Sequence, residues 1–201
     1  MKSKVSSLIS TGNRKLSKEI AIFNMSSATD CPSKKKGLCK AASCGAKCYA
    51  MKAEQAYPAA LPYRRRQEQL WKNITSEQFS NGLAELNANK KVKISALRLN
   101  EAGDFHTQAC VDKAECIAIR LAAEGITTYA YTSRNDLDFS GCKRLIINGS
   151  GFKTKGVANV FKIVDNISQL PKGYSLCGGS CGKGVCTRCM SRGMKTAVLK
   201  H

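Results

Sequence analysis

Short apolar runs alternate with amphipathic stretches along this chain, a pattern that predicts alternating strands and helices. The expected strands cover residues 20–23, 92–99, 126–132, 145–147, 160–164 and 174–176. Within 92–99 (VKISALRL), Val92, Ile94 and Ala96 alternate with other positions and are expected to face inward. Residues 126–132 (ITTYAYT) are rich in β-branched and aromatic side chains, which favour strands.

Two amphipathic stretches before the second strand predict helices. The first covers residues 63–73 and follows Pro58 and Pro62. The second is expected after Thr75, which forms the T-x-x-Q pattern of a capping box with Gln78. Its apolar positions, spaced for one helical face, are Phe79, Leu83 and Leu86.

A further helix connects two of the predicted strands. Thr107 could cap its start, and Gly125 is typical of the stop signal at its end. Its apolar stripe consists of Val111, Ala114, Ala118 and Leu121. Because a strand, a helix and a strand with short joints form a βαβ unit, the strands at 92–99 and 126–132 should be parallel, with a right-handed crossover.

The predicted fold is a single α/β domain over residues 1–201, built on a parallel sheet. The chain is shorter than the ~250 residues of a complete eight-unit barrel, so an open or partial β/α barrel is expected. In such folds the chemistry lies at the carboxyl ends of the strands. Polar side chains collect there at Arg98, Asn100, Glu101, Asp104, Thr132, Ser133, Arg134, Asn135, Asp136, Asn148 and Ser150.

Eight of the eleven cysteines stand in two groups, each within one loop. The loop at residues 26–50 carries Cys31, Cys39, Cys44 and Cys48. The loop at residues 177–190 carries Cys177, Cys181, Cys186 and Cys189. Four thiolates form the ligand set of a tetrahedral zinc ion or an iron–sulfur cluster, whereas magnesium and calcium prefer oxygen. Both loops are therefore predicted to bind metal.

The spacing within each group bears on which metal it binds. The second group, C-x3-C-x4-C-x2-C, has only one C-x2-C knuckle of a zinc ribbon, and its glycines let amides turn toward the sulfurs, which favours iron–sulfur over zinc. In the first group, Cys44 and Cys48 match half of the radical-SAM signature C-x3-C-x2-C, but Met51 stands at the third position. Cys39, Cys44 and Cys48 could still ligate three irons and leave the fourth to Cys31 or a small molecule. One site shared by both groups is an alternative to two separate sites.

The chain is strongly basic, with a formal net charge of +19 from 33 basic and 14 acidic side chains. Such a charge favours polyanions such as DNA, RNA, nucleotides or an acidic protein, although a lysine-rich surface can also serve solubility alone. The first residues, MKSKVSSLISTGNRK, lack the apolar core of a signal peptide, and no apolar run approaches a membrane span. We therefore expect a cytoplasmic protein without membrane contact, whose thiols stay reduced.

Several motifs occur in an order that resembles a known family. They are CP…GLCKAASCGAKCYA, an arginine-rich helix, LRLNEAGDF, YAYTSRND and CGGSCGKGVCTRCM. From about Leu16 to Met190, this order resembles the phage "gene product 88" family. The resemblance implies a phage or mobile-element origin, hence host cytosol, with a partial-barrel α/β fold and cysteine-bound iron–sulfur, but it supplies no reaction. The C…CYA opening is also similar to that of another phage family with a radical-SAM-like motif, so the barrel is expected to be radical-SAM-like.

Residues at the strand ends are the candidates for chemistry. Glu101, Asp104 and His106 could hold a substrate or move a proton, or Asp104 could instead cap the helix that follows. Arg98 and Arg134 could clamp a phosphate or a carboxylate, or neutralise acidic loop residues or the charge of a cluster.

Other residues receive structural interpretations. Tyr49 could shield a cluster bound by Cys48, or it is a core aromatic. A solvated helix face is expected for the run Arg64, Arg65 and Arg66. Three irregularly spaced cysteines are expected to be buried free thiols, namely Cys110, Cys116 and Cys142.

These features lead to one hypothesis and one alternative. The hypothesis is an iron–sulfur protein that binds one or two 4Fe-4S clusters and performs redox or radical chemistry on a nucleic-acid or nucleotide substrate, with S-adenosylmethionine as a candidate cofactor. The alternative is a non-enzymatic basic protein, stapled by zinc or a cluster, that binds DNA, RNA or a host protein.

Overall fold

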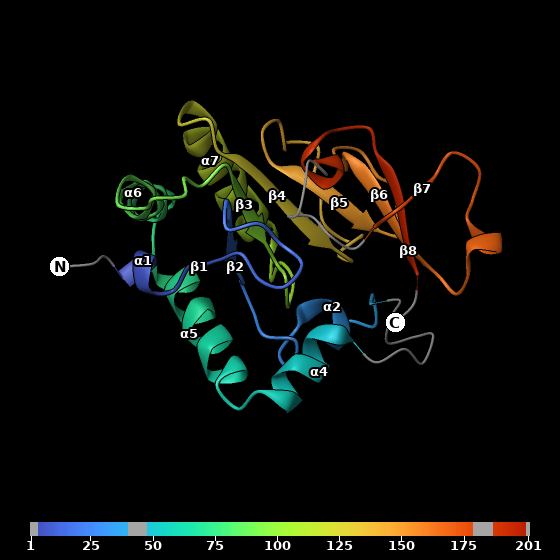
Figure 1. Cartoon of the computed structure of the whole chain (residues 1–201), viewed down its shortest axis with the longest axis horizontal. Helices are drawn as coiled ribbons and strands as arrows, with labels where there is room; N and C mark the ends of the chain where they lie inside the picture. Colours follow the sequence, from blue (N-terminus) through green and yellow to red (C-terminus); the bar gives the residue numbers. More distant parts are fainter. Residues whose placement is uncertain (1–3, 40–47, 179–186, 200–201) are drawn as a thin grey trace.

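One open, eight-stranded sheet organises this computed structural model, which describes residues 4–39, 48–178 and 187–199 (Figure 1). The strands are β1 (Ser10–Thr11), β2 (Ile20–Phe23), β3 (Ala96–Leu99), β4 (Thr127–Thr132), β5 (Ile146–Ser150), β6 (Asn159–Val164), β7 (Ser175–Leu176) and β8 (Lys195–Leu199). Their order in the sheet is β1-β2-β3-β4-β5-β6-β8-β7. Only β1 and β2 pair antiparallel, and every other neighbouring pair is parallel.

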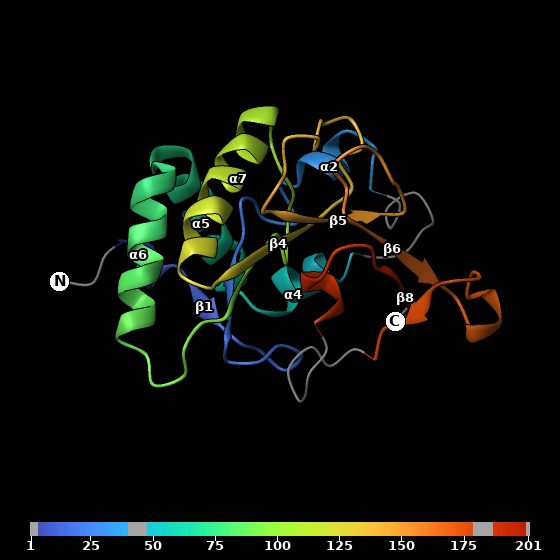
Figure 2. The same ribbon diagram turned by 90° about the horizontal axis from the view of Figure 1, so that it is seen from above.

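Most of the helical residues precede β4 in the chain. The α-helices are α1 (Lys4–Ser7), α2 (Pro32–Lys35), α4 (Tyr49–Ala56), α5 (Ala60–Asn73), α6 (Ser76–Ala88) and α7 (Gln108–Ala123), and the 3-10 helices are η1 (Ile167–Gln169) and η2 (Arg188–Met190). Figures 1 and 2 show α5, α6 and α7 gathered beside β1–β4, while β5–β8 extend toward the other end of the molecule. Residues 133–145 and 151–158, which lead into β5 and β6, contain no helix.

Apolar side chains lie on both faces of the sheet. The larger core includes Ala21, Phe23, Leu97, Leu99, Ala130 and Ile147 from the strands, packed with side chains of α5, α6 and α7. The opposite face, called the second face below, carries Ile20, Ile22, Ala96, Tyr129 and Ile146, with Cys189 and Met190 of η2 packed against it. Because β2 is covered on both sides, all four of its residues are buried.

Much of the predicted organisation is confirmed. The chain is α/β, its sheet is mostly parallel and does not close, and β3–α7–β4 is a parallel βαβ unit. The capping box at Thr75 and Gln78 is present at the start of α6. Gly125 has a φ of +72° directly after α7, the left-handed conformation that favours glycine at a helix end.

Several element boundaries differ from the prediction. Val92 is 42% exposed, and the strand begins at Ala96, so the expectation that Val92 faces inward is wrong. Helix α5 starts at Ala60 rather than at residue 63, because Pro62 fits the first turn of a helix, where no amide hydrogen bond is lost. Helix α4 and strand β8 were not predicted, and β8 lies between β6 and β7 in the sheet.

No helix within the described part of the chain is long and apolar enough to cross a membrane.

Candidate functional site

The loops that follow β2 and β3 are held together by backbone-directed hydrogen bonds. Asn24 accepts a hydrogen bond from the Ala102 amide at 2.7 Å, and Asn100 accepts one from the Met25 amide at 3.3 Å. Gly103 has a φ of +70°, and a Cβ there would lie 2.0 Å from the hydroxyl oxygen of Ser26. The second loop can therefore approach the first only because this position is glycine.

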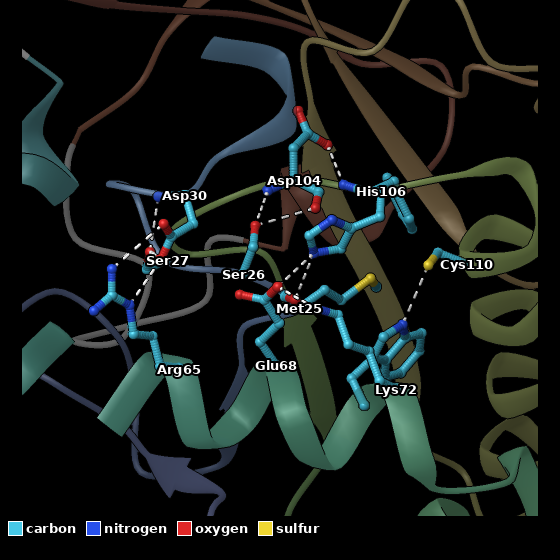
Figure 3. A network of polar contacts seen from close by, with 12 residues as sticks. Met25, Ser26, Ser27, Asp30, Arg65, Glu68, Lys72, Asp104, His106 and Cys110 are labelled. Carbon is cyan, nitrogen blue, oxygen red and sulfur yellow. Dashed lines mark hydrogen bonds and ion pairs between the residues drawn. The ribbon is translucent and has the colours of Figure 1, made fainter. Parts of the chain in front are cut away.

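Asp104 is the buried carboxylate at this junction, with 3% of its surface exposed (Figure 3). The Ser33 hydroxyl donates to its Oδ2 at 2.5 Å, and the Ser133 amide donates to the same atom at 2.8 Å. The Thr132 hydroxyl and the Phe105 amide donate to Oδ1 at 2.6 and 2.8 Å. One carboxylate thus joins α2, the loop after β3 and the end of β4.

Burial and hydrogen bonding shift the pKa of Asp104 in opposite directions. Burial raises the pKa of its carboxyl, whereas the donors from Ser33, Thr132 and two amides lower the pKa, and the net shift is upward. Asp104 does not cap α7, whose N-cap residue is Thr107 and whose start has no side-chain cap. The capping alternative for Asp104 is therefore wrong.

His106 lies beside a carboxylate that comes from helix α5 (Figure 3). Its Nε2 is 3.1 Å from the carbonyl oxygen of Met25 and 3.4 Å from Glu68 Oε1. Glu68 Oε1 also accepts a hydrogen bond from Lys72 Nζ at 2.7 Å. The structure therefore pairs His106 with Glu68, and Asp104 is satisfied by other partners.

Arg134 is a buried guanidinium, 1% exposed, and each of its three nitrogens donates to a protein acceptor. Its Nε and Nη2 bind the two carboxylate oxygens of Asp136 at 2.6 and 2.9 Å, and its Nη1 donates to the carbonyl oxygens of Phe105 and His106. Lys36, the C-cap residue of α2, binds Asp136 as well, at 2.9 Å. Arg134 therefore neutralises Asp136, an acidic loop residue, which is one of the roles predicted for it.

Glu101 binds two residues that precede and follow the first cysteine group, Asn13 and Tyr49. Its carboxylate accepts a hydrogen bond from Asn13 Nδ2 at 2.6 Å, and its carbonyl oxygen accepts one from the Tyr49 hydroxyl. Tyr49 is 61% exposed, so it is not a core aromatic. Cys48 is the N-cap residue of α4, and Tyr49 is the first helical residue.

Arg98 projects from β3 among aromatic side chains. Its guanidinium carbon lies 5.0 Å from the ring centroid of Tyr131, which is a cation–π distance. Burial lowers the pKa of Arg98, but the electrostatic contributions of Tyr49, Tyr129 and Tyr131 raise it, and the net shift is upward. In the described part of the chain, the buried Nε of Arg98 has no hydrogen-bond partner.

Cys189 of the second cysteine group lies on the second face. The Tyr131 hydroxyl donates to Cys189 Sγ at 2.6 Å, and Asn148 Nδ2 donates to the Cys189 carbonyl oxygen at 3.1 Å. Burial raises the pKa of Tyr131 well above its usual value, and Cys189 raises it further. Cys177, by contrast, follows β7 at the far edge of the sheet, where its amide donates to the Ala197 carbonyl oxygen at 2.7 Å.

Cys31 of the first group directly precedes α2 and is half-buried. Burial raises its pKa to about 12, and Asp104 and Cys39 contribute in the same direction. The amides of Ser33 and Lys34 act against this shift, although no side-chain cap hydrogen bond forms at this helix start. A metal ion would therefore have to displace the thiol proton in order to bind Cys31.

The remaining predicted ligands, Cys44, Cys181 and Cys186, lie outside the described residues. Within residues 4–39, 48–178 and 187–199, no three cysteine, histidine or acidic side chains gather closely enough to hold a metal ion.

Two structural interpretations need correction. Cys116 is exposed, because it lies on the face of α7 opposite the buried stripe, whereas Cys142 is buried and Cys110 is half-buried. Arg64 is 8% exposed and binds Glu54 at 2.9 Å, so it is not part of a solvated face. Glu54 also accepts hydrogen bonds from the amides of two residues after β2, which anchors α4 to this loop.

The α5 residues near His106 were not predicted from the sequence. Arg65, Glu68 and Lys72 are spaced three and four residues apart, so they share one helical face. This spacing was the signal that could have found them, but a charged helix face usually indicates only contact with water.

Comparison with known proteins identifies the family. A model of the family described as "Gene product 88" matches residues 7–150, which include the first cysteine group, the Asp104 junction and the strand ends of β3 and β4. The match ends before the second cysteine group. No curated protein and no solved structure matches the chain significantly. Because the family model covers well over half of the sequence, the chain belongs to the phage gene product 88 family.

Proposed function

We propose that the protein binds an iron–sulfur cluster through its cysteine groups near the second face of the sheet. We further propose that it performs redox or radical chemistry there on a nucleotide or nucleic-acid substrate. The observation that carries this proposal is the position of Arg98, which interacts with both Tyr49 and Tyr131. Tyr49 follows Cys48 of the first group, and Tyr131 binds Cys189 of the second.

The donor set and the surrounding charge fit such a group. Thiolates suit iron–sulfur clusters, and a 4Fe-4S cluster with four thiolates carries a charge of about −2. Among the residues that the structure describes, the buried Nε of Arg98 has no hydrogen-bond partner, and an anionic group on this face would accept its hydrogen bond. A bound cluster would supply one-electron chemistry. The Tyr131 hydroxyl, by donating to Cys189 Sγ, would stabilise the thiolate and tune the potential.

Metal analysis of anaerobically purified protein tests this proposal. We expect iron and sulfide, with a broad charge-transfer absorption band, in the wild-type protein. Cys48→Ala and Cys189→Ala should each lose iron, whereas Cys116→Ala, which removes an exposed thiol of α7, should retain it. If the two cysteine groups bind separate clusters, each variant should lose only the iron bound by its own group. If the groups share one cluster, either variant should lose all of the iron. A colourless protein with stoichiometric zinc and no sulfide would refute the proposal.

Reaction with S-adenosylmethionine tests the radical chemistry separately. The dithionite-reduced protein should cleave S-adenosylmethionine, and Cys48→Ala should abolish the cleavage while Cys116→Ala preserves it. Iron-loaded protein that leaves the compound intact would limit the function to electron transfer or structure.

The net charge of +19 favours a second candidate function, a zinc-stapled protein that binds DNA or RNA without catalysis. This candidate predicts stoichiometric zinc and an affinity for nucleic acid that falls steeply as salt rises.

A further inference from the structure

A pocket of about 480 Å³ opens between α2 and α5, and its lining is rich in charge (Figure 3). Four cationic side chains line it: Lys35, Lys36, Arg65 and Lys72. Two carboxylates, Asp30 and Glu68, and the imidazole of His106 complete its charged and titratable groups. The pocket thus draws on α2, α5 and the loops after β2 and β3.

Both carboxylates of the pocket are already committed to protein partners. Asp30 accepts hydrogen bonds from Arg65 Nε at 2.9 Å and from the Ser27 hydroxyl at 2.8 Å. Glu68 binds Lys72 and His106 through the same oxygen. A carboxylate in these positions holds the cations in place and does not need an external cation.

The cations of the pocket, in contrast, remain available to a ligand. The side chains of Arg65 and Lys72 are about half exposed, at 53% and 50%, and ion pairs at such exposure contribute little to stability. Lys36 is 52% exposed and pairs with Asp136, which lies outside the pocket lining. Lys35 forms no ion pair with any described residue. The lining therefore has a surplus of positive charge directed at the open space.

We propose that this pocket binds a terminal phosphate group, the phosphomonoester of a nucleotide or of a 5′-phosphorylated nucleic-acid strand. A phosphomonoester carries a charge of about −1.5 to −2 at neutral pH, which matches the surplus of two cations over carboxylates in the lining. The volume falls within the range of about 300–1,000 Å³ that is usual for small-molecule sites. Lysine and arginine side chains at this spacing supply charge-assisted hydrogen bonds to phosphate oxygens.

The lining also indicates what the pocket does not recognise. Among the described residues that line it there is no tyrosine, tryptophan or phenylalanine, so recognition rests on the phosphate and not on stacking of a base. We expect little discrimination between bases. This proposal specifies the substrate chemistry of the proposed function, yet it requires no bound metal.

Equilibrium binding of matched oligonucleotides tests the proposal. The full chain, as purified and with its metal content measured, is titrated at 150 mM salt with one short single strand that carries either a 5′-phosphate or a 5′-hydroxyl. The phosphorylated strand should bind about tenfold more tightly, which is the effect of one or two charge-assisted hydrogen bonds. A nucleoside 5′-monophosphate that competes at a similar concentration identifies free nucleotide as a sufficient ligand, whereas competition by the oligonucleotide alone identifies the strand end.

Pocket variants with opposite effects on charge make the test specific. Lys35→Gln and Lys72→Gln should each reduce the preference for the 5′-phosphate severalfold, and Asp30→Asn should increase affinity for it, because one negative charge is removed. Arg120→Gln removes an exposed cation near the far end of α7 and should leave the preference unchanged. Circular dichroism and thermal melts verify folding of each variant.

Equal affinity of the wild-type protein for the 5′-phosphate and 5′-hydroxyl strands would overturn the inference. An equal loss of preference in Arg120→Gln and Lys35→Gln would also overturn it, since the effect would then come from net charge alone. Neither result depends on iron content, so failure here is distinguishable from failure of the iron–sulfur proposal.

Discussion

At the scale of single residues, buried charges connect segments that lie far apart in the sequence. Asp104 binds Ser33 and Thr132, and Arg134 binds the carbonyl oxygens of Phe105 and His106. Asp104, His106 and Arg134 were predicted as candidates because they follow strands in the sequence. Their partners could not be predicted from the sequence. Ser33 becomes a neighbour of Asp104, and Glu68 a neighbour of His106, only when α2 and α5 pack against the strand ends.

Replacement of Asp104 should destabilise the whole domain. Asp104→Ala removes the acceptor of two hydroxyls and of two amides, and a buried donor left unsatisfied typically costs about 1–3 kcal/mol. We expect the free energy of unfolding in urea to fall by about 3 kcal/mol. Asp112→Ala, at an exposed position of α7, should change it by less than about 0.5 kcal/mol. A similar small effect in both variants would contradict the role of Asp104 as a junction.

The ion pairs of Asp136 with Arg134 and Lys36 should make the Tm depend on pH in the acid range. Hydrogen bonds from Arg134, followed by those from Lys36, lower the pKa of Asp136 well below its usual range. Because the folded-state pKa lies below the unfolded value, the contribution is present above a pH of about 4 and is lost as the pH falls further. Asp136→Asn should therefore have a lower Tm than wild type at pH 6, with a difference that shrinks at pH 3. A difference in Tm between Asp136→Asn and wild type that stays constant from pH 6 to pH 3 would argue against these ion pairs.

At the scale of elements, predictions succeeded where local sequence decides the structure. Helix α6 has a capping box, and helix α7 has a clear apolar stripe followed by the stop glycine Gly125. The strand Ile20–Phe23 was predicted with its correct bounds. Helix α4 was missed because it begins at Tyr49, directly after the N-cap residue Cys48, which makes no side-chain cap hydrogen bond. Strand β8 is a short segment whose position depends on pairing with β6, a contact that local pattern does not encode.

Two threonines provide a matched test of helix capping. The Thr75 hydroxyl accepts a hydrogen bond from the Gln78 amide at 3.1 Å, whereas Thr107 at the start of α7 makes no side-chain cap. Thr75→Ala should reduce the free energy of unfolding by about 1 kcal/mol. Thr107→Ala should reduce the free energy of unfolding by less than Thr75→Ala does. Urea titrations of the two variants under the same conditions measure both losses. Equal losses would show that the capping box adds nothing beyond the threonine side chain itself.

At the scale of the whole molecule, segments from opposite ends of the sequence approach Arg98 of β3. Tyr49, which follows Cys48, interacts with Arg98, and so does Tyr131, which binds Cys189. The order of its strands follows the chain through β6, which sequence patterns could predict. The insertion of β8 before β7 could not be predicted, and it determines where the second cysteine loop starts and ends. The open form of the sheet leaves two edges, formed by β1 and β7, each only two residues long.

These short edges have a consequence for self-association. A long exposed edge strand offers unpaired backbone groups to another chain and promotes aggregation, whereas a two-residue edge offers few. Behind β1 lies β2, whose four apolar residues IAIF would form a far more adhesive edge if they were uncovered. Gly12→Pro, which removes the hydrogen bond from the Gly12 amide to the Ile20 carbonyl oxygen at 2.9 Å and cannot adopt the φ of +65° found there, should therefore increase light scattering during storage at 37 °C. Lys93→Pro, at an exposed position before β3, is the matched control, and its solution should stay clear. These results would show that the short strand Ser10–Thr11 protects β2 from pairing with other copies of the chain, and so prevents insoluble aggregates.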